Sequence, residues 1–241
     1  MALPTITVMK HELTIPSTGQ KIHFRPFLVK EEKILMMAMQ SGETKDMIKA
    51  LNDIIKNCVE GEIDTSKLAI FDVEYIFLQL RARSIGDKIE INYSEPDILC
   101  EKKKDQPCIF EIDLDLNEIQ IERDDKHKSL VDITDNIKVK LNYPELENAE
   151  SVGSMDNVEG MFKLIASSID YIMDGEEMHK TTDYTEQEVN DFLNSLSSDQ
   201  FKSITSFFET MPRISKEVNG KCSLCGNEQT KVLSGMQDFF G

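Results

Sequence analysis

The sequence lacks the long apolar runs of membrane proteins. Its longest runs, "ILMMAM" at 34–39 and "YIFL" at 75–78, fall far short of the roughly 20 residues that a helix needs to cross a bilayer. The opening residues, "MALPTITVMKHELTIP", contain no apolar signal core either. We therefore expect a soluble protein that is made inside the cell, spans no membrane and is not exported.

Positive charge is scarce as well. Lysine and arginine number 27 against 44 aspartates and glutamates, which gives a formal net charge of −17. Such a surface repels phosphate backbones, so we expect no direct binding to nucleic acid. The acidity suits docking to basic protein partners, or it serves only to keep the protein soluble. The sequence leaves both readings open.

Catalytic signatures are also missing. The histidines are scattered, and no H-E-x-x-H metal motif joins any two of them. The sequence has no G-x-S-x-G nucleophile motif, no phosphate-binding glycine loop and no dinucleotide fingerprint. The four histidines are His11, His23, His127 and His179. We predict that the protein is not an enzyme.

The 241 residues do contain clear periodic patterns. An alternating pattern around a Pro-Gly turn predicts an amino-terminal β-hairpin or extended arm. Apolar residues at helical spacing predict helices over 30–42, 44–59, 71–86, 157–175, 185–196 and 198–212. Period-two alternation predicts strands over 87–93, 108–114, 118–122, 137–144, 213–221 and 230–235. The predicted fold class is α+β, with two helical segments around a small β block.

The same patterns divide the chain into four segments. Residues 1–86 form a hairpin or arm plus helices, and residues 87–143 form a β-rich block. Residues 144–212 form a second helical segment. Residues 213–241 form a cysteine-tipped hairpin that packs on the β block.

Five cysteines are present. Cys58 lies on the apolar stripe of a predicted helix, so we expect it to be a small buried hydrophobe. The other four form two pairs at the tips of predicted hairpins: Cys100 with Cys108, and Cys222 with Cys225. Two hairpin tips with two thiolates each can make a tetrahedral zinc-ribbon site.

The two cysteine pairs differ in how well their spacing matches that of known zinc ligands. "CSLCG" at 222–226 is a good metal knuckle, whereas the seven residues between Cys100 and Cys108 exceed the usual gap of a zinc ligand pair. We predict a structural zinc ion bound by Cys100, Cys108, Cys222 and Cys225; the alternative is free thiols. Four thiolates leave no open position for substrate, and the nearby Lys102, Lys103 and Lys104 would partly offset their charge.

Three stretches together resemble a known family. They are "ELTIPSTGQKIHFRPFLVKEEKILMMAMQSG" at 12–42, "IIKNCVEGEIDTSKLAIFDVEYIFLQLRARSIGDKIEINY" at 54–93 and "CSLCGNEQTKVLSGMQDFF" at 222–240. They resemble the baseplate hub proteins of T-even-like contractile-tailed bacteriophages. Members of that family often carry a short knuckle where this chain has the long loop between Cys100 and Cys108, a departure that concerns the metal site.

The resemblance implies a non-enzymatic structural or assembly protein of the tail baseplate hub. Its partners would be other hub and tail proteins, and self-association is left open. It would act in the host cytoplasm during assembly, with the virion tail baseplate as a further location. We expect "RPFLVKEE" at 25–32 and the Phe239–Phe240 terminus either to dock neighbouring subunits or to fold back on the core. The alternative function is a zinc-ribbon adaptor that binds transcription or replication machinery.

Overall fold

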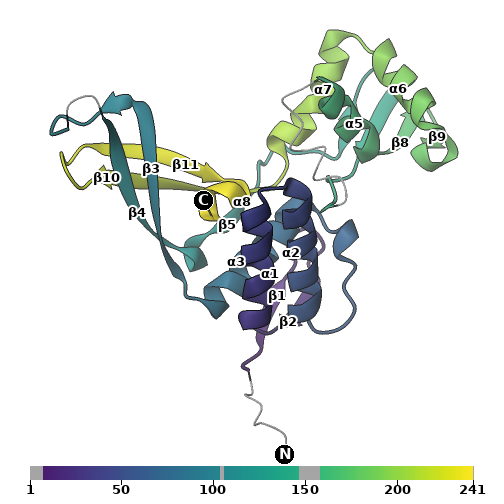
Figure 1. Cartoon of the computed structure of the whole chain (residues 1–241). Helices are drawn as coiled ribbons and strands as arrows, with labels where there is room; N and C mark the ends of the chain where they lie inside the picture. The colour runs from purple at the N-terminus through teal and green to yellow at the C-terminus, as the bar shows by residue number, and fades with distance from the viewer. Residues whose placement is uncertain (1–7, 104–105, 147–157, 241) are drawn as a thin grey trace, which may run out of the picture.

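The computed structural model describes residues 8–103, 106–146 and 158–240, and for residues 236, 237 and 240 it describes the backbone alone. The described chain forms three parts: a helical body, a central sheet that extends from it as a long arm, and a separate lobe (Figure 1). The structure confirms the α+β fold class.

The helical body begins with a two-stranded hairpin and continues with three helices. Its elements are β1 (His11–Thr14), β2 (Lys21–Phe24), α1 (Val29–Ser41), α2 (Thr44–Cys58), η1 (Thr65–Lys67) and α3 (Ile70–Ser84). The apolar stripe of α2 packs with one side of α3 and with the hairpin, and Ile54, Ile55 and Ile76 are at most 1% exposed there. The three predicted helices of this region are confirmed.

A buried ion pair fixes the start of α1. The Glu31 carboxylate is fully buried, lies 2.9 Å from the Arg25 guanidinium and accepts a hydrogen bond from the Leu28 N–H. Glu31 therefore caps the first turn of the helix while it neutralises a partly buried arginine.

The central sheet combines strands from the middle and the end of the chain. Its elements are β3 (Lys88–Leu99), β4 (Pro107–Asp115), η2 (Leu116–Glu118), β5 (Gln120–Glu122), β10 (Arg213–Cys222), β11 (Glu228–Ser234) and the short helix α8 (Gly235–Phe240). The strand order is β11-β10-β4-β3, with β5 also paired to β10. The inner face packs against α3 through Ile112, Leu114 and Val218, so the last strands complete a sheet that begins more than a hundred residues earlier.

The lobe has a four-stranded antiparallel sheet of order β6-β7-β8-β9 covered by helices. Its elements are β6 (Leu130–Asp132), β7 (Ile137–Leu141), α5 (Val158–Ser168), β8 (Ile169–Asp174), β9 (Glu177–Lys180), η4 (Thr181–Asp183), α6 (Glu186–Ser195) and α7 (Ser198–Thr210). In the sequence, Thr185 and Glu188 have the spacing that predicts a capping box, and the structure shows this box at the start of α6. Ile204 and Phe207 of α7 lie in the lobe core.

The prediction of one helix over 157–175 is wrong in its second half. The helix α5 ends at Ser168, and the chain continues as strand β8, which pairs with β7 on one side and β9 on the other. Ile169 and Ile172 fit a helical spacing, but β-branched and aromatic residues here also suit a strand with partners on both sides. Residues 144–212 therefore include a β-hairpin, and the strands of 87–143 divide between two sheets.

The lobe is an insertion between two paired strands. Strand β5 precedes it and strand β10 follows it, and Glu122 lies opposite Arg213 in the β5–β10 pairing. Contacts with α3 hold the lobe against the body: the Ile70 N–H donates to the Pro144 carbonyl at 3.0 Å, and the Phe71 and Tyr143 rings meet edge to face at 5.0 Å.

Asp72, the next residue of α3, is a buried carboxyl group in this junction. It is fully buried, and its Oδ1 accepts a hydrogen bond from the Ser17 N–H at 2.9 Å. Burial raises the pKa of Asp72, because a charged carboxylate loses its hydration there.

Two aromatic residues that we considered for docking are part of the protein's own core. Phe239 is 2% exposed and packs in the core between α3 and the central sheet. Phe27 is likewise buried, in the helical body. The prediction that these two rings dock neighbouring subunits is therefore wrong, and the alternative that they fold back on the core holds. The neighbouring Leu28 and Val29 are exposed. No helix of the described residues has the length and apolar character needed to span a membrane.

Candidate metal centre

The first cysteine pair lies at the end of the β3–β4 hairpin. Cys100 follows the last residue of β3, and its N–H donates to the Gln106 carbonyl at 2.8 Å. The register of the two strands shifts between Glu95 and Leu99, so Leu99 lies opposite Pro107. This irregularity brings Cys100 beside Cys108 despite the long gap between them in sequence.

The second pair lies on the turn between β10 and β11. Cys222 ends β10, and its carbonyl accepts a hydrogen bond from the Gly226 N–H at 2.8 Å. The Cys222 N–H in turn donates to the Asn227 carbonyl. Gly226 has φ of 80°, in the left-handed region that favours glycine, so the glycine of "CSLCG" is needed to close this knuckle.

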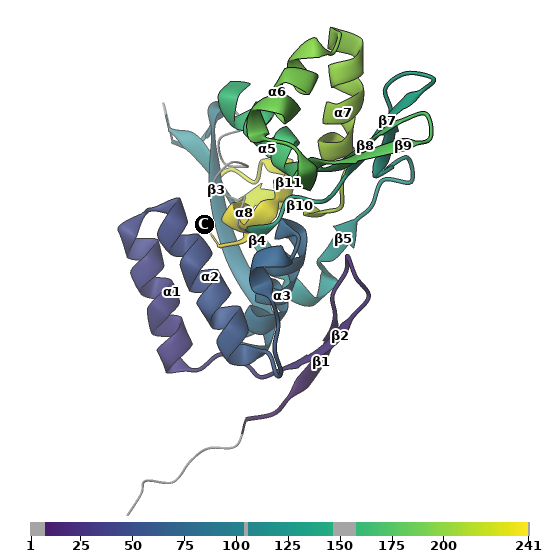
Figure 2. The same cartoon turned by 90° about the vertical axis from the view of Figure 1, so that its right-hand side faces the viewer.

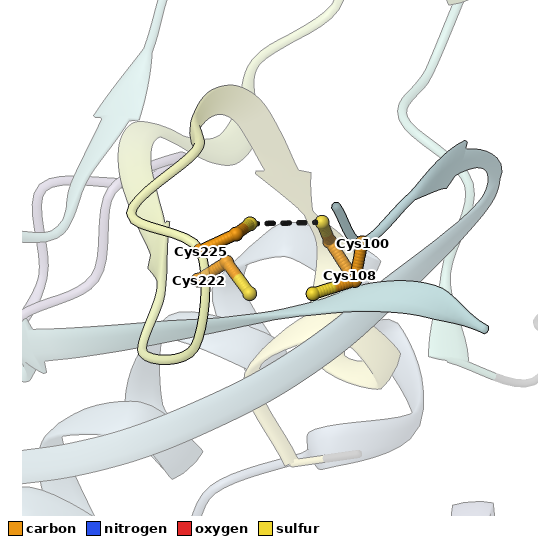
Figure 3. A group of neighbouring side chains, drawn as sticks. All are labelled: Cys100, Cys108, Cys222 and Cys225. Atoms are coloured by element: carbon orange, nitrogen blue, oxygen red, sulfur yellow. Dashed lines mark hydrogen bonds between the residues drawn. The ribbon is translucent and has the colours of Figure 1, made fainter. Parts of the chain in front are cut away.

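Pairing between β4 and β10 brings the two hairpin tips together. Cys222 lies opposite Phe110, and Cys108 lies two residues before Phe110, so all three side chains point to the same face of the sheet. Figure 3 shows the four cysteine side chains pointing toward one another from the two hairpins. Their sulfur atoms all lie within 4.8 Å of one another. The two predicted pairs therefore form one cluster.

The cluster has the dimensions of a four-thiolate site. Zinc–sulfur bonds of about 2.3 Å in a tetrahedron place the sulfur atoms about 3.8 Å apart. The Sγ atoms of Cys108 and Cys225 are 3.5 Å apart, and none of the five cysteines forms a disulfide. Cys100, Cys108 and Cys222 are buried and Cys225 is partly exposed, so the site is closed on most sides.

The thiols of the cluster differ in acidity. Backbone N–H groups, first that of Cys225 and then that of Leu224, lower the pKa of Cys222 to about 6. Burial, together with the neighbouring sulfur atoms, raises the pKa of Cys108 to about 12. Without a cation, the four thiols therefore cannot all be ionised near neutral pH. A divalent metal ion would offset the repulsion between neighbouring thiolates and so favour their ionised form, and four thiolates suit zinc.

A packed layer supports the cluster, and the sequence analysis missed it. Phe110 is fully buried and stacks on Tyr93 with ring centroids 5.1 Å apart. The Tyr93 hydroxyl donates to the Gln229 carbonyl at 3.3 Å, and the Lys231 Nζ lies 4.6 Å from the centre of the Tyr93 ring. Gly220 lies against the Phe110 Cβ and the Tyr93 ring, with no room for a side chain. The sequence signal was the glycine two residues before Cys222, in "NGKC".

The lysines near the cluster do not form a basic surface. Lys102 and Lys103 are exposed at the hairpin tip, and Lys104 lies outside the described residues. Lys221 is paired with Glu228 at 3.1 Å.

Other candidate ligands do not converge in the described part of the chain. His11 lies against Phe24, His179 contacts Tyr184, and His127 contacts Thr210. Across residues 8–103, 106–146 and 158–240, the four cysteines are the only group of three or more cysteine, histidine or acidic residues close enough to hold a metal ion. Cys58 is buried in the helical body, as predicted.

The chain was then compared with known proteins. It is 26% identical over 223 residues to the "Baseplate hub assembly protein gp26" of Enterobacteria phage T4, and the match covers 92% of this chain and 94% of that protein. No solved structure matches it. The family described as "T4 bacteriophage base plate protein" matches residues 8–241. The resemblance found in the sequence is confirmed, and the chain belongs to this phage baseplate protein family.

Proposed function

We propose that this protein is a non-enzymatic structural or assembly protein of the phage baseplate hub. The observation that carries the proposal is the similarity, over 92% of the chain, to a protein named as a hub assembly protein. In this role it acts through contacts with other hub and tail proteins. The closed, four-thiolate geometry of the cysteine cluster supports a structural use of the site, since it leaves no position for a substrate.

The cysteine cluster holds a structural zinc ion in this proposal. The ion would tie the β10–β11 hairpin to the β3–β4 hairpin, and so close a loop that includes the whole lobe. Closing a long loop restricts the unfolded chain strongly. Where a zinc site forms only on folding, the binding free energy, on the order of 10 kcal/mol, adds to the stability of the fold.

Metal analysis of the purified protein tests the zinc assignment. We expect one zinc ion per chain, and cobalt substitution should give the charge-transfer absorption of tetrahedral thiolate ligation. Cys108→Ser and Cys222→Ser should lower the zinc content and the unfolding temperature. Cys58→Ser is the matched control for the zinc content, which it should leave unchanged, because Cys58 is buried away from the cluster. A metal content unchanged by Cys222→Ser would exclude this site.

In this role the protein would act in the host cytoplasm during assembly, and in the tail baseplate if it stays in the particle. Phage that lack the gene should make no complete tails, and a plasmid copy should restore them. A tagged copy should co-purify with hub proteins from infected cells. Its presence or absence in finished particles separates a structural subunit from an assembly factor, whereas normal tails without the gene would refute the proposal.

The adaptor alternative gains no support from the surface near the cysteines. The solvent face of the central sheet carries the exposed acidic residues Glu111 and Asp113, together with Glu228, which is paired with Lys221. Because β4 pairs with β10 and β10 with β11, these carboxylates lie on one face beside the knuckle. Phosphate backbones would be repelled by this face.

A further inference from the structure

The outward face of helix α1 carries several exposed apolar side chains. Toward the core, α1 presents the buried Ala38 and Glu31, and the partly buried Ile34 and Leu35 pack there too. Val29, Met36 and Met37 on the other side are 79%, 56% and 61% exposed. Helix geometry places residues 29, 33, 36 and 40 on one side, so Lys33 and Gln40 accompany the apolar residues there. A surface helix normally turns mainly polar residues outward, so the exposed valine and methionines are unusual.

No other part of the described chain covers this face. Helix α1 packs on α2, and Figures 1 and 2 show it on the outer side of the helical body. We use the term "α1 face" for the exposed side chains of Leu28, Val29, Met36, Met37 and Met39 together with Lys30 and Lys33. Exposed apolar side chains gathered on one helix mark interaction sites more often than scattered ones do.

The α1 face carries positive charge although the protein is acidic. Glu31 is shared between Arg25 at 2.9 Å and Lys30 at 3.2 Å, so these three residues have a net charge of +1. Lys33 is exposed one turn further along and adds a second positive charge. Glu32, the remaining acid of the helix, is partly exposed one turn before Met36 and offsets one of these charges. With three basic and two acidic residues, Arg25, Lys30, Lys33, Glu31 and Glu32 have a net charge of +1. In a chain with a net charge of −17, this face therefore selects a partner that is acidic and apolar.

We propose that the α1 face is the docking surface for an α-helix of another baseplate hub protein, one whose apolar stripe is flanked by carboxylates. The identity of the partner rests on the proposed function. Methionine side chains are unbranched and adapt their shape, which suits ridge-into-groove packing of one helix on another. A symmetric contact with the α1 face of a second copy is disfavoured, because it would bring the same lysines together.

The size of the α1 face sets the expected strength of the contact. The 13 residues of helix α1 extend about 20 Å at 1.5 Å per residue, so one face of this helix buries less surface than a stable heterodimer needs. Contacts of this size are weak and transient, and we expect a dissociation constant in the micromolar range.

Methyl NMR of the full chain tests the proposal directly. The 12 methionines are labelled with 13C at the methyl group, and each purified hub protein of the same phage is added in turn. A designed helical peptide with a leucine stripe flanked by glutamates is a second probe, and the same peptide with lysines in place of the glutamates is its control. The Met36, Met37 and Met39 signals should shift with at least one hub protein and with the glutamate peptide.

The matched control is Met178 of β9, which is 50% exposed and lies in the lobe. Its signal should not move, and the lysine peptide should bind at least tenfold more weakly than the glutamate peptide. The M36K/M37K double variant should lose at least tenfold in affinity while it keeps its unfolding temperature, since both side chains are exposed. M178K should bind as the wild type does. Shifts at Met178, equal binding by M36K/M37K, or a dimer that M36K/M37K disrupts would overturn the proposal.

Phage assembly separates this proposal from the function on which it rests. If the gene is required for tails but the M36K/M37K phage assembles them normally, the docking surface is wrong and the hub function stands. If phage without the gene makes normal tails, the hub function itself is wrong.

Discussion

Replacing Gly220 with alanine tests whether close packing beneath the cysteine cluster holds the two hairpins in place. An alanine Cβ at this position would lie 2.9 Å from the Phe110 Cβ and 3.0 Å from the Tyr93 Cε1. Non-bonded carbon atoms prefer separations of about 3.5–4.0 Å. The Phe110 Cβ is fixed to the backbone of β4, so it cannot swing aside and the two strands must separate.

Two opposing effects set the magnitude. Overpacking of a well-packed core costs about 1–3 kcal/mol. Alanine restricts the unfolded chain more than glycine does, which offsets about 0.4–1 kcal/mol of that loss. The net loss of unfolding free energy should be about 1–2 kcal/mol. Because Cys222 lies two residues further along β10, zinc affinity should fall about tenfold, the factor that corresponds to about 1.4 kcal/mol.

Urea unfolding at a fixed free zinc concentration measures the first quantity, and competition with a chromophoric chelator measures the second. Asn219→Ala is the control, because Asn219 is the neighbouring residue on the exposed face of β10 and the new residue is the same. The variant loses a solvent-exposed hydrogen bond from Thr230 but creates no close contact. Asn219→Ala should change the unfolding free energy by less than about 0.5 kcal/mol. A Gly220→Ala variant with wild-type stability and zinc affinity would refute the reasoning.

Three further predictions concern the body and the lobe. Burial raises the pKa of Asp72 above its usual value of 3.8, so at pH values between these two the folded protein binds more protons than the unfolded chain does. The contribution of Asp72 to stability should therefore fall as pH rises through this window. Urea unfolding from pH 4 to 7 should show this fall in the wild type and not in Asp72→Asn. Glu31→Ala leaves Arg25 partly buried without its carboxylate and should cost about 3 kcal/mol by urea unfolding, whereas Glu32→Ala should be near neutral. Thr185→Ala removes the cap of α6 and should cost about 1 kcal/mol, seen as faster hydrogen exchange in the lobe.

Local patterns in the sequence predicted those elements in which the spacing of apolar residues or the capping residues match the packing seen in the fold. The stripe of α2 and the capping box of α6 are examples, since each is fixed within one helix. The stretch after Ser168 was missed because its spacing fits a helix and a strand equally well. Pairing with β7, which is distant in the sequence, and with β9, which follows after a short turn, decides the outcome there.

The cysteine cluster was predictable because chemistry constrains it. Thiol ligands come in pairs on turns, so the two hairpin tips could be joined without knowledge of the fold. The supporting layer of Tyr93, Phe110 and Gly220 could not be predicted, because its members come from three strands whose order the sequence does not reveal. For the same reason, Phe239 was not recognisable as a core residue of a sheet formed mainly by earlier strands.

The insertion of the lobe between β5 and β10 has a consequence for how such proteins can diversify. Since Glu122 and Arg213 lie side by side, the chain leaves and re-enters the central sheet at nearly the same point. Recombination between related phages could therefore exchange the lobe without disturbing the strands or the cysteines that follow, provided that the residues in contact with α3, such as Tyr143 and Pro144, are kept. The body and its cysteine cluster could then stay constant while the rest of the inserted unit is exchanged.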